Sequence, residues 1–188
     1  MKPTILILSL LLTLTACSTQ KPTHKETVAT YYQAFDKGNF NKIKEVANDS
    51  LTIVSGDFVV PYNHASLYEM FKWDSIFKSS YEIIELEEKG NEVIAIIGQK
   101  NLRNAYLENN PLEYQVRISF TSDKILKIEE LEYEGTDWSI WQTKRDTLVS
   151  WVKVNHPELD GFLNDMTMNG AMNYLKAIEL YGAEHKTP

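Results

Sequence analysis

Cysteine, proline and glycine are scarce in this sequence of 188 residues, which contains one, six and eight of them. A single cysteine excludes a disulfide within the chain, and with it a fold held together by disulfides. Basic residues are also few, because 19 lysines and arginines stand against 26 aspartates and glutamates. The resulting net charge of −7 argues against a nucleic-acid partner, since such proteins present a basic surface to the phosphates.

Several sequence motifs of known enzymes are also absent. The four histidines are scattered and have no metal-binding spacing such as His-Glu-x-x-His. There is no Gly-x-Ser-x-Gly motif for a serine nucleophile and no glycine-rich phosphate loop. We therefore expect no metal and no cofactor.

The N-terminus carries the most informative pattern that is present. Lys2 precedes an apolar run from Ile5 to Leu14, which at about ten residues is too short to span a bilayer. Small residues and Cys17 follow, as in a secretory signal peptide. The tetrad Leu14-Thr15-Ala16-Cys17 resembles the lipobox of bacterial lipoproteins, which implies cleavage before Cys17 and a diacylglyceryl group on its sulfur. An ordinary signal peptide followed by an incidental cysteine is the alternative.

This resemblance predicts where the protein resides. Residues 1–16 would be the signal peptide and residues 17–24 a lipidated tether, so the membrane is a partner through the lipid on Cys17. No later apolar run approaches spanning length. Ser18 follows the lipidated residue, and in Gram-negative lipoproteins a serine there is associated with transfer to the outer membrane. We expect a bacterial envelope location, facing the periplasm from the outer membrane if the cell is Gram-negative.

Apolar spacing predicts helices in the first part of the mature chain. Thr23 and Glu26 fit a capping box, and a helical apolar face follows until Gly38, which suits a helix C-terminus. Shorter patterns predict helices over 40–47 and 67–77. The residues of the first apolar face are Val28, Tyr31, Tyr32 and Phe35.

The middle of the chain predicts β-strands. They cover residues 51–54, 58–62, 81–87, 92–102, 112–120 and 125–133. The segment Val93 to Ile97 is apolar at every position, which predicts a central strand covered on both faces. The segment 112–120 alternates apolar and polar residues, so one of its faces should be polar. This polar face consists of Glu113, Gln115, Arg117 and Ser119.

Helical periodicity returns after Gly135. One helix should end before His156-Pro157, because a residue before proline disfavours helix. Another is predicted from Met168 to Tyr181. No Pro/Gly/Ser-rich linker separates this region, so we expect it to pack on the sheet.

This order of elements resembles the nuclear transport factor 2-like superfamily, which includes the SnoaL-like and ketosteroid isomerase-like proteins. Residues 31–43 resemble its opening pattern, residues 67–77 its third helix, and residues 120–125 its last hairpin. The resemblance implies an α+β cone, in which a curved antiparallel sheet wraps on three N-terminal helices. It would occupy residues 25–134, and residues 135–188 would be a C-terminal helical extension.

The resemblance also implies positions for catalytic groups. Ketosteroid isomerase-like enzymes combine a tyrosine, a protonated acid and a carboxylate base. By position these roles fall on Tyr31, Val116 and Ser55. Valine cannot donate a hydrogen bond and serine cannot abstract a carbon-bound proton, so the sequence leans against an enzyme. Asp57 is a second candidate carboxylate, although a turn aspartate is the simpler interpretation.

Three functions remain open on this evidence. The first is a non-catalytic, lipid-anchored protein that binds a small apolar ligand or has an accessory role. The second is a diverged isomerase-like or SnoaL-like enzyme that uses Tyr31 and Asp57. The third is an interaction protein with a filled pocket, whose polar sheet face forms a homodimer or binds another partner. The predicted pocket residues are Tyr31, Ser55, Trp73, Tyr114, Val116 and Ile118.

The last predicted strand ends in a cluster of acidic residues. A cation site is one interpretation of this cluster, and a solvent-exposed face is the more ordinary one. The sequence favours the second interpretation. The cluster consists of Glu129, Glu130, Glu132 and Glu134.

Overall fold

Helix α1 (His24–Asp36) begins at the predicted capping box. The Thr23 side chain accepts a hydrogen bond from the backbone of Glu26, whose carboxylate accepts one from the Thr23 backbone at 2.8 Å. Gly38 follows the helix with φ of 62°, a conformation that glycine adopts without strain. The computed structural model describes residues 21–185. The predicted signal peptide and Cys17 lie outside these described residues.

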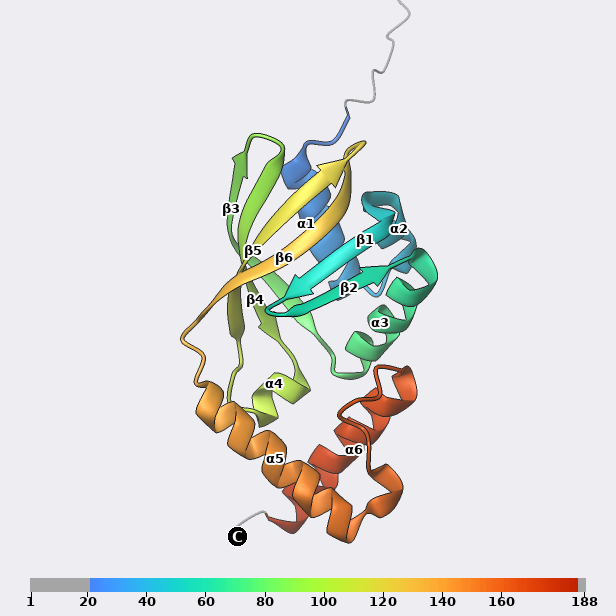
Figure 1. Ribbon diagram of the computed structural model, residues 1–188, viewed down its shortest axis with the longest axis vertical. Coiled ribbons are helices and arrows are strands. Elements are labelled where there is room, and N and C mark those ends of the chain that lie inside the picture. Colours follow the sequence, from blue (N-terminus) through green and yellow to red (C-terminus); the bar gives the residue numbers. More distant parts are fainter. Residues whose placement is uncertain (1–20, 186–188) are drawn as a thin grey trace, which may run out of the picture.

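Figure 1 shows the order of the remaining elements along the chain. They are α2 (Phe40–Val46), β1 (Ala47–Ser55), β2 (Phe58–Tyr62), α3 (His64–Ile76), β3 (Ser80–Lys89), β4 (Glu92–Lys100), α4 (Leu102–Tyr106), β5 (Leu112–Thr121), β6 (Lys124–Glu134), α5 (Trp138–Asn155), a 3-10 turn (Pro157–Leu159) and α6 (Met168–Glu184).

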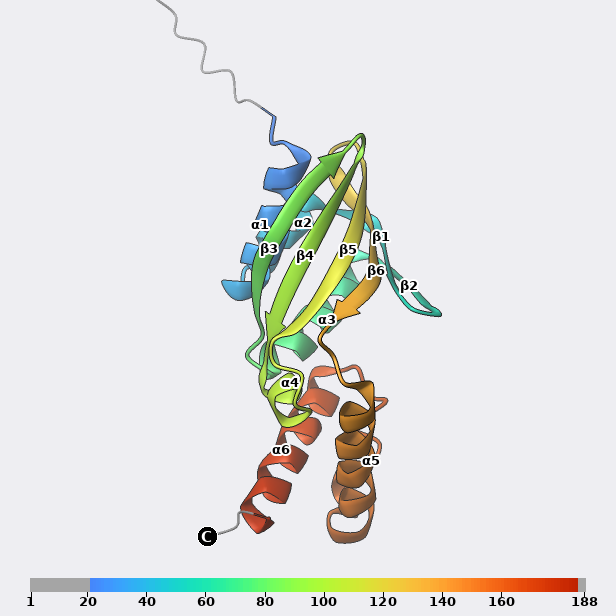
Figure 2. The ribbon, with the colours of Figure 1, turned by 90° about the vertical axis from the view of Figure 1, so that its left-hand side faces the viewer.

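The six strands form one curved sheet in the order β2-β1-β6-β5-β4-β3. Strands β1 and β6 run parallel, and the other neighbouring pairs are antiparallel. Helices α1 to α3 lie on one side of this sheet, as Figures 1 and 2 show. The predicted α+β class is therefore confirmed.

The main core lies between α1 and the inner face of the sheet. Val28, Tyr31 and Tyr32 of α1 are buried, as their helical spacing predicted. In β5 the alternation holds, because Val116 and Ile118 face this core while the polar residues between them stay half-exposed. One face of β5 is therefore apolar and the other is polar.

Strand β4 differs from its prediction in two ways. Ile94 and Ile96 are only half-buried on the outer face, so this strand is not covered on both sides. The strand also ends at Lys100 and does not reach Leu102. Asn101 instead caps the short helix α4, because its side chain accepts a hydrogen bond from the Asn104 backbone at 2.6 Å.

The C-terminal helices lie beyond the end of the sheet, and the expectation that they would pack on it was wrong (Figures 1 and 2). Helix α6 packs on α3, α4 and α5. The reason is a second apolar cluster, in which Phe77 at the end of α3 meets Leu148 of α5 and Tyr174 of α6. Within residues 21–185, no helix is both long and apolar enough to cross a membrane.

Candidate functional site

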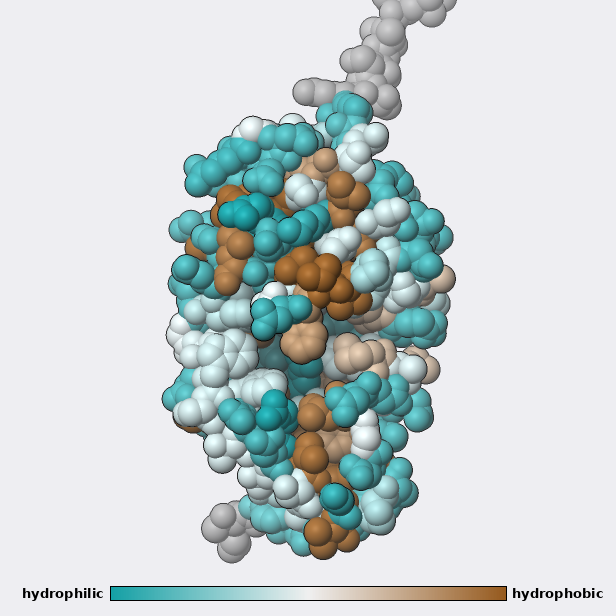
Figure 3. Space-filling view, viewed as in Figure 1, coloured by the Kyte–Doolittle hydropathy of each residue, from teal (hydrophilic) through white to brown (hydrophobic). Residues whose placement is uncertain are grey.

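A cavity of about 360 Å³ lies between the inner face of the sheet and helices α1, α3 and α4. Its walls are mainly aromatic and aliphatic, with a few polar groups among them. Figure 3 shows a hollow on this face of the molecule, between an apolar patch and the C-terminal helices. The lining residues are Tyr31, Tyr32, Phe35, Ile53, Ser55, Phe58, Val60, Tyr62, Met70, Trp73, Asp74, Tyr81, Gln99, Arg103, Leu112, Tyr114, Ile128, Glu130, Tyr133 and Met166.

One polar cluster in the cavity comes from β1 and β6. Ser55 lies directly beside Glu130 in the parallel pairing of these strands. The hydroxyls of Ser55 and Tyr133 both donate to the same oxygen of Glu130, and the two hydroxyls are 3.3 Å apart. Burial and the neighbouring Glu130 raise the pKa of Tyr133, so its phenol keeps the proton that it donates.

A β-bulge brings Glu130 and Tyr133 to the same face of β6. Residues three apart on a regular strand point to opposite faces. Here the register against β5 shifts, because Val116 pairs with Glu130 and Tyr114 pairs with Tyr133. The extra residue on β6 turns both side chains toward the cavity.

The second polar cluster is centred on Asp74 of α3, which is 6% exposed. Its carboxylate accepts hydrogen bonds from the Ser79 hydroxyl at 2.7 Å and from the Gln99 amide at 3.5 Å. The same amide nitrogen donates to the Tyr81 hydroxyl at 2.9 Å. Burial raises the pKa of Asp74, while hydrogen bonds from Ser79 and Tyr81 and the charge of Arg103 act in the opposite direction.

Arg103 of α4 is the cation in the cavity wall. Its guanidinium carbon lies 5.0 Å from the centre of the Trp73 ring and 5.9 Å from that of Phe77. Aromatic faces attract cations at such distances. The two rings of α3 therefore hold the Arg103 side chain against the wall.

The structure brings four of the six predicted pocket residues together. Tyr31, Ser55, Trp73 and Tyr114 line the cavity. Val116 and Ile118 are fully buried in the main core and do not line it. The alternation of β5 does place them on the inner face, where they belong to the same buried cluster as Val28 of α1.

Asp57 does not reach the cavity. It lies in the turn between β1 and β2, where it is exposed to solvent. The strand does not continue through this residue, so Asp57 does not share the face of Ser55. Asp57 therefore supplies no carboxylate to the cavity.

Sequence reasoning missed three charged residues of the site, Asp74, Arg103 and Glu130. Glu130 was grouped with an acidic face exposed to solvent, which holds for its exposed neighbours Glu132 and Glu134. Arg103 was missed because the predicted strand ended at Leu102 and no helix was predicted after it. Of these three residues, Asp74 is the one that the sequence could have indicated, because it follows the predicted pocket residue Trp73 on the predicted third helix.

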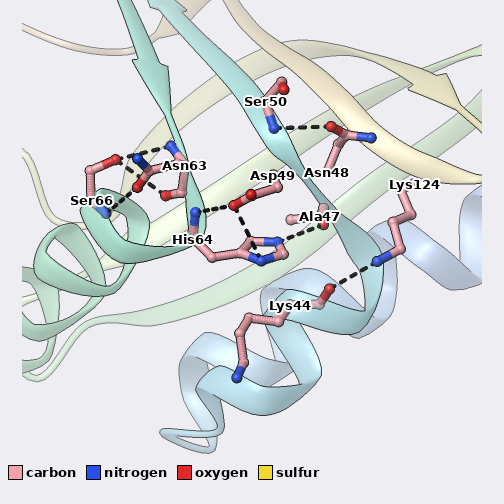
Figure 4. A network of polar contacts seen from close by, with 9 residues as sticks. All are labelled: Lys44, Ala47, Asn48, Asp49, Ser50, Asn63, His64, Ser66 and Lys124. Carbon is pink, nitrogen blue, oxygen red and sulfur yellow. Dashed lines mark hydrogen bonds and ion pairs between the residues drawn. The ribbon is translucent and has the colours of Figure 1, made fainter.

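A wider hollow of about 780 Å³ lies between α2 and the start of α3. His64 lies in its wall, but both ring nitrogens already have partners, at 3.2 Å from the Ala47 carbonyl and 3.3 Å from the Asp49 carboxylate (Figure 4). The Asp49 carboxylate also accepts from the His64 backbone at 2.6 Å. This network fixes the start of α3 to β1. Its polar groups already interact with one another.

No group of three or more metal-ligating side chains gathers anywhere in residues 21–185.

Comparison with known proteins identifies the fold of the chain. No protein-family model and no curated protein sequence matches the chain. An NTF2-like protein of unknown function from Cytophaga hutchinsonii superposes with a TM-score of 0.50 at 16% identity, over 62% of this chain and 94% of its own. IdmH from Streptomyces antibioticus, a candidate polyketide cyclase, gives 0.50 at 12% identity, over 66% and 99%. A protein from Kribbella flavida gives 0.50 at 8% identity, over 65% and 96%.

These structural similarities show the fold of the chain and do not show its function. The chain has the nuclear transport factor 2-like fold, with a curved six-stranded sheet and helices. The three structures are covered almost completely, while about a third of this chain has no counterpart in them.

Replacing Asp74 by asparagine is predicted to make the free energy of unfolding less dependent on pH. Because burial raises its pKa, the folded protein holds the Asp74 proton more tightly than the unfolded chain, where the pKa is about 3.9. The wild type should therefore lose stability relative to Asp74→Asn as pH rises from the unfolded value through the raised folded value. Urea unfolding between about pH 4 and about pH 8 measures this difference.

Asp57→Asn is the control, because it removes the same charge from a solvent-exposed turn. Parallel pH profiles for the wild type and Asp74→Asn would contradict the assignment.

Proposed function

We propose that the protein binds a small, largely apolar molecule in the cavity beneath α1 and the sheet, and that lipid on Cys17 holds it at a bacterial envelope membrane. The open cavity is the observation that supports the binding of a small molecule. Its volume of about 360 Å³ falls within the range of small-molecule sites, roughly 300–1,000 Å³.

The composition of the walls supports the same ligand class. Aromatic side chains from α1, β3, β5 and β6 surround the space, and polar groups enter from two clusters. Known sites for small molecules have this character, with apolar walls for affinity and a few polar groups for orientation. The open space argues against the hypothesis of an interaction protein with a filled pocket.

A bulky side chain at the cavity wall is predicted to block binding. Val60 of β2 lines the cavity, whereas its neighbour Val59 does not and is 64% exposed. Val60→Trp should weaken the binding of 2-naphthamide, a neutral two-ring probe, by about tenfold or more, because it fills space that the probe needs. Isothermal titration calorimetry measures the dissociation constant.

Val59→Trp is the matched control, since it places the same side chain one residue away on the opposite face of the strand. It should bind the probe as the wild type does. No binding by the wild type, or equal loss in both variants, would count against the cavity as the site.

The lipid anchor is supported by the sequence around Cys17. Two acyl chains give stable attachment, because each buried methylene contributes about 0.8 kcal/mol. Lys21 is the first described residue, and it pairs with Asp123 in the β5–β6 turn. The chain therefore approaches its predicted anchor from the end of the molecule that lies opposite the C-terminal helices (Figure 1).

Mass spectrometry of the native protein checks the anchor. The wild type is expected to begin at residue 17 and to carry the mass of a diacylglyceryl group on Cys17. Cys17→Ser should carry no lipid, because it lacks the sulfur, and Ser18→Ala should keep it. An unmodified Cys17 in the wild type rules out the anchor. The outer-membrane location and a homodimer through the polar sheet face stay predictions.

Acid–base catalysis is a second candidate function, and Glu130 is the observation that favours it. The carboxylate missing at Ser55 is supplied by the adjacent strand, since Glu130 lies beside Ser55 in the cavity. In this reaction Glu130 takes a proton from the carbon next to a ketone. The electron pair of the broken C–H bond forms the C=C bond of an enolate, and the pair of the C=O π bond moves onto the ketone oxygen. Tyr31, which also lines the cavity, would donate a hydrogen bond to the resulting enolate.

Glu130→Gln is predicted to slow proton exchange by about 100-fold or more, since a general base contributes about that much. The measurement is deuterium uptake by 2-tetralone from heavy water, followed by NMR. Glu129→Gln is the matched control, because Glu129 pairs with Lys127 and Arg117 outside the cavity. Equal rates in the two variants, or a wild type no faster than buffer, would exclude Glu130 as a base.

A further inference from the structure

Arg103 is held at the cavity wall with its orientation fixed. It lies in α4, which the Asn101 side chain caps. Trp73 and Phe77 flank its guanidinium at 5.0 and 5.9 Å. Because an arginine that packs on rings has lost much of its freedom already, a ligand that binds it orders few further groups.

No side-chain hydrogen bond or ion pair joins Arg103 to another residue within 21–185. Its Nε is buried and has no partner among residues 21–185. The other two arginines of the chain behave differently, since Arg117 pairs with Glu92 and Glu129 while Arg145 pairs with Asp146. Because Nε is enclosed by the protein, a ligand in the cavity would meet the two terminal nitrogens of the guanidinium, which are not enclosed and form no ion pair among residues 21–185.

The acidic groups of the cavity are not hydrogen-bond acceptors for Arg103. Asp74 accepts from Ser79 and Gln99, and Glu130 accepts from Ser55 and Tyr133. Neither carboxylate forms an ion pair with Arg103 among the described residues. The guanidinium therefore faces the cavity beside two acids that already have donors.

The charged groups of the cavity favour one kind of anionic group on the ligand over another. A guanidinium presents two parallel N–H groups, which match the two oxygens of a carboxylate. A doubly charged phosphate would meet one cation and two acids, which disfavours it. A carboxylate carries one charge, and the raised pKa of Asp74 lessens the repulsion that it meets.

We infer that Arg103 binds the carboxylate of the cavity's ligand, so that the ligand is an apolar or aromatic carboxylic acid. This inference rests on the proposed function, because it names the chemical class that the proposed site takes. The aromatic walls hold the body of the acid, and Arg103 selects its charged end.

The test compares two probes of the same shape on the full chain in lipid nanodiscs. The probes are 2-naphthoate and the neutral 2-naphthamide, and empty nanodiscs correct for partition into lipid. The wild type should bind the acid about tenfold or more tightly than the amide, because a charge-assisted pair contributes that much. Arg103→Gln should lose this preference and bind the acid and the amide within about twofold of each other.

Arg145→Gln is the matched control, because Arg145 also stacks on a tryptophan, Trp141 at 4.8 Å, but lies outside the cavity. It should keep the full preference for the acid. If Arg103→Gln does not fold, as circular dichroism would report, Arg103→Lys replaces it. Arg103→Lys should reduce the preference several-fold, because lysine keeps the charge and loses the paired donors.

The outcomes separate this inference from the proposed function. Equal binding of acid and amide by the wild type overturns the role of Arg103 and leaves the cavity as a site for apolar molecules. A full preference for the acid in Arg103→Gln, or in Arg103→Lys where it is used, also overturns it. Binding of neither probe overturns the proposed function together with the inference.

Discussion

The packing of α1 against the inner face of the curved sheet is the contact on which the rest of the structure depends. The first half of α1 lies directly on the strands, with Val28 fully buried and His24 stacked on Phe120 at 4.0 Å. The second half, with Tyr31 and Tyr32, faces space that these side chains do not fill. A straight helix follows a curved sheet over only part of its length, and the cavity lies where the two separate.

The C-terminal helices act on this cavity through α3 and α4. They bury Phe77 in a second apolar cluster, and the residues beside it, Trp73 and Asp74, face the cavity. The loop before α6 adds Met166 to the wall. The added helices thus complete a site that the sheet and α1 begin, and they leave the outer face of the sheet uncovered.

Among residues 21–185, each acid of the cavity accepts hydrogen bonds from neighbouring donors, whereas the Arg103 guanidinium has no acceptor. Glu130 holds two hydroxyls and Asp74 holds a hydroxyl and an amide, whereas the Nε of Arg103 has no partner among the described residues. In a cavity of low polarity, a guanidinium without an acceptor favours a ligand that supplies a hydrogen-bond acceptor. The proposals of binding, of proton transfer at Glu130 and of acid recognition at Arg103 therefore concern different atoms of one site.

Periodicity and capping in the sequence by themselves determined the α+β class, the order of the elements and the burial of α1, because these patterns are local and repeat along the chain. Tyr31, Ser55, Trp73 and Tyr114, which line the cavity, were suggested instead by the resemblance to the superfamily. Only the tertiary structure decided that Glu130 joins Ser55, since a one-residue bulge in β6 leaves no periodic signal. It likewise decided that Arg103 meets the cavity and that the last helices avoid the sheet. Those outcomes depend on how distant surfaces fit together, which no local pattern encodes.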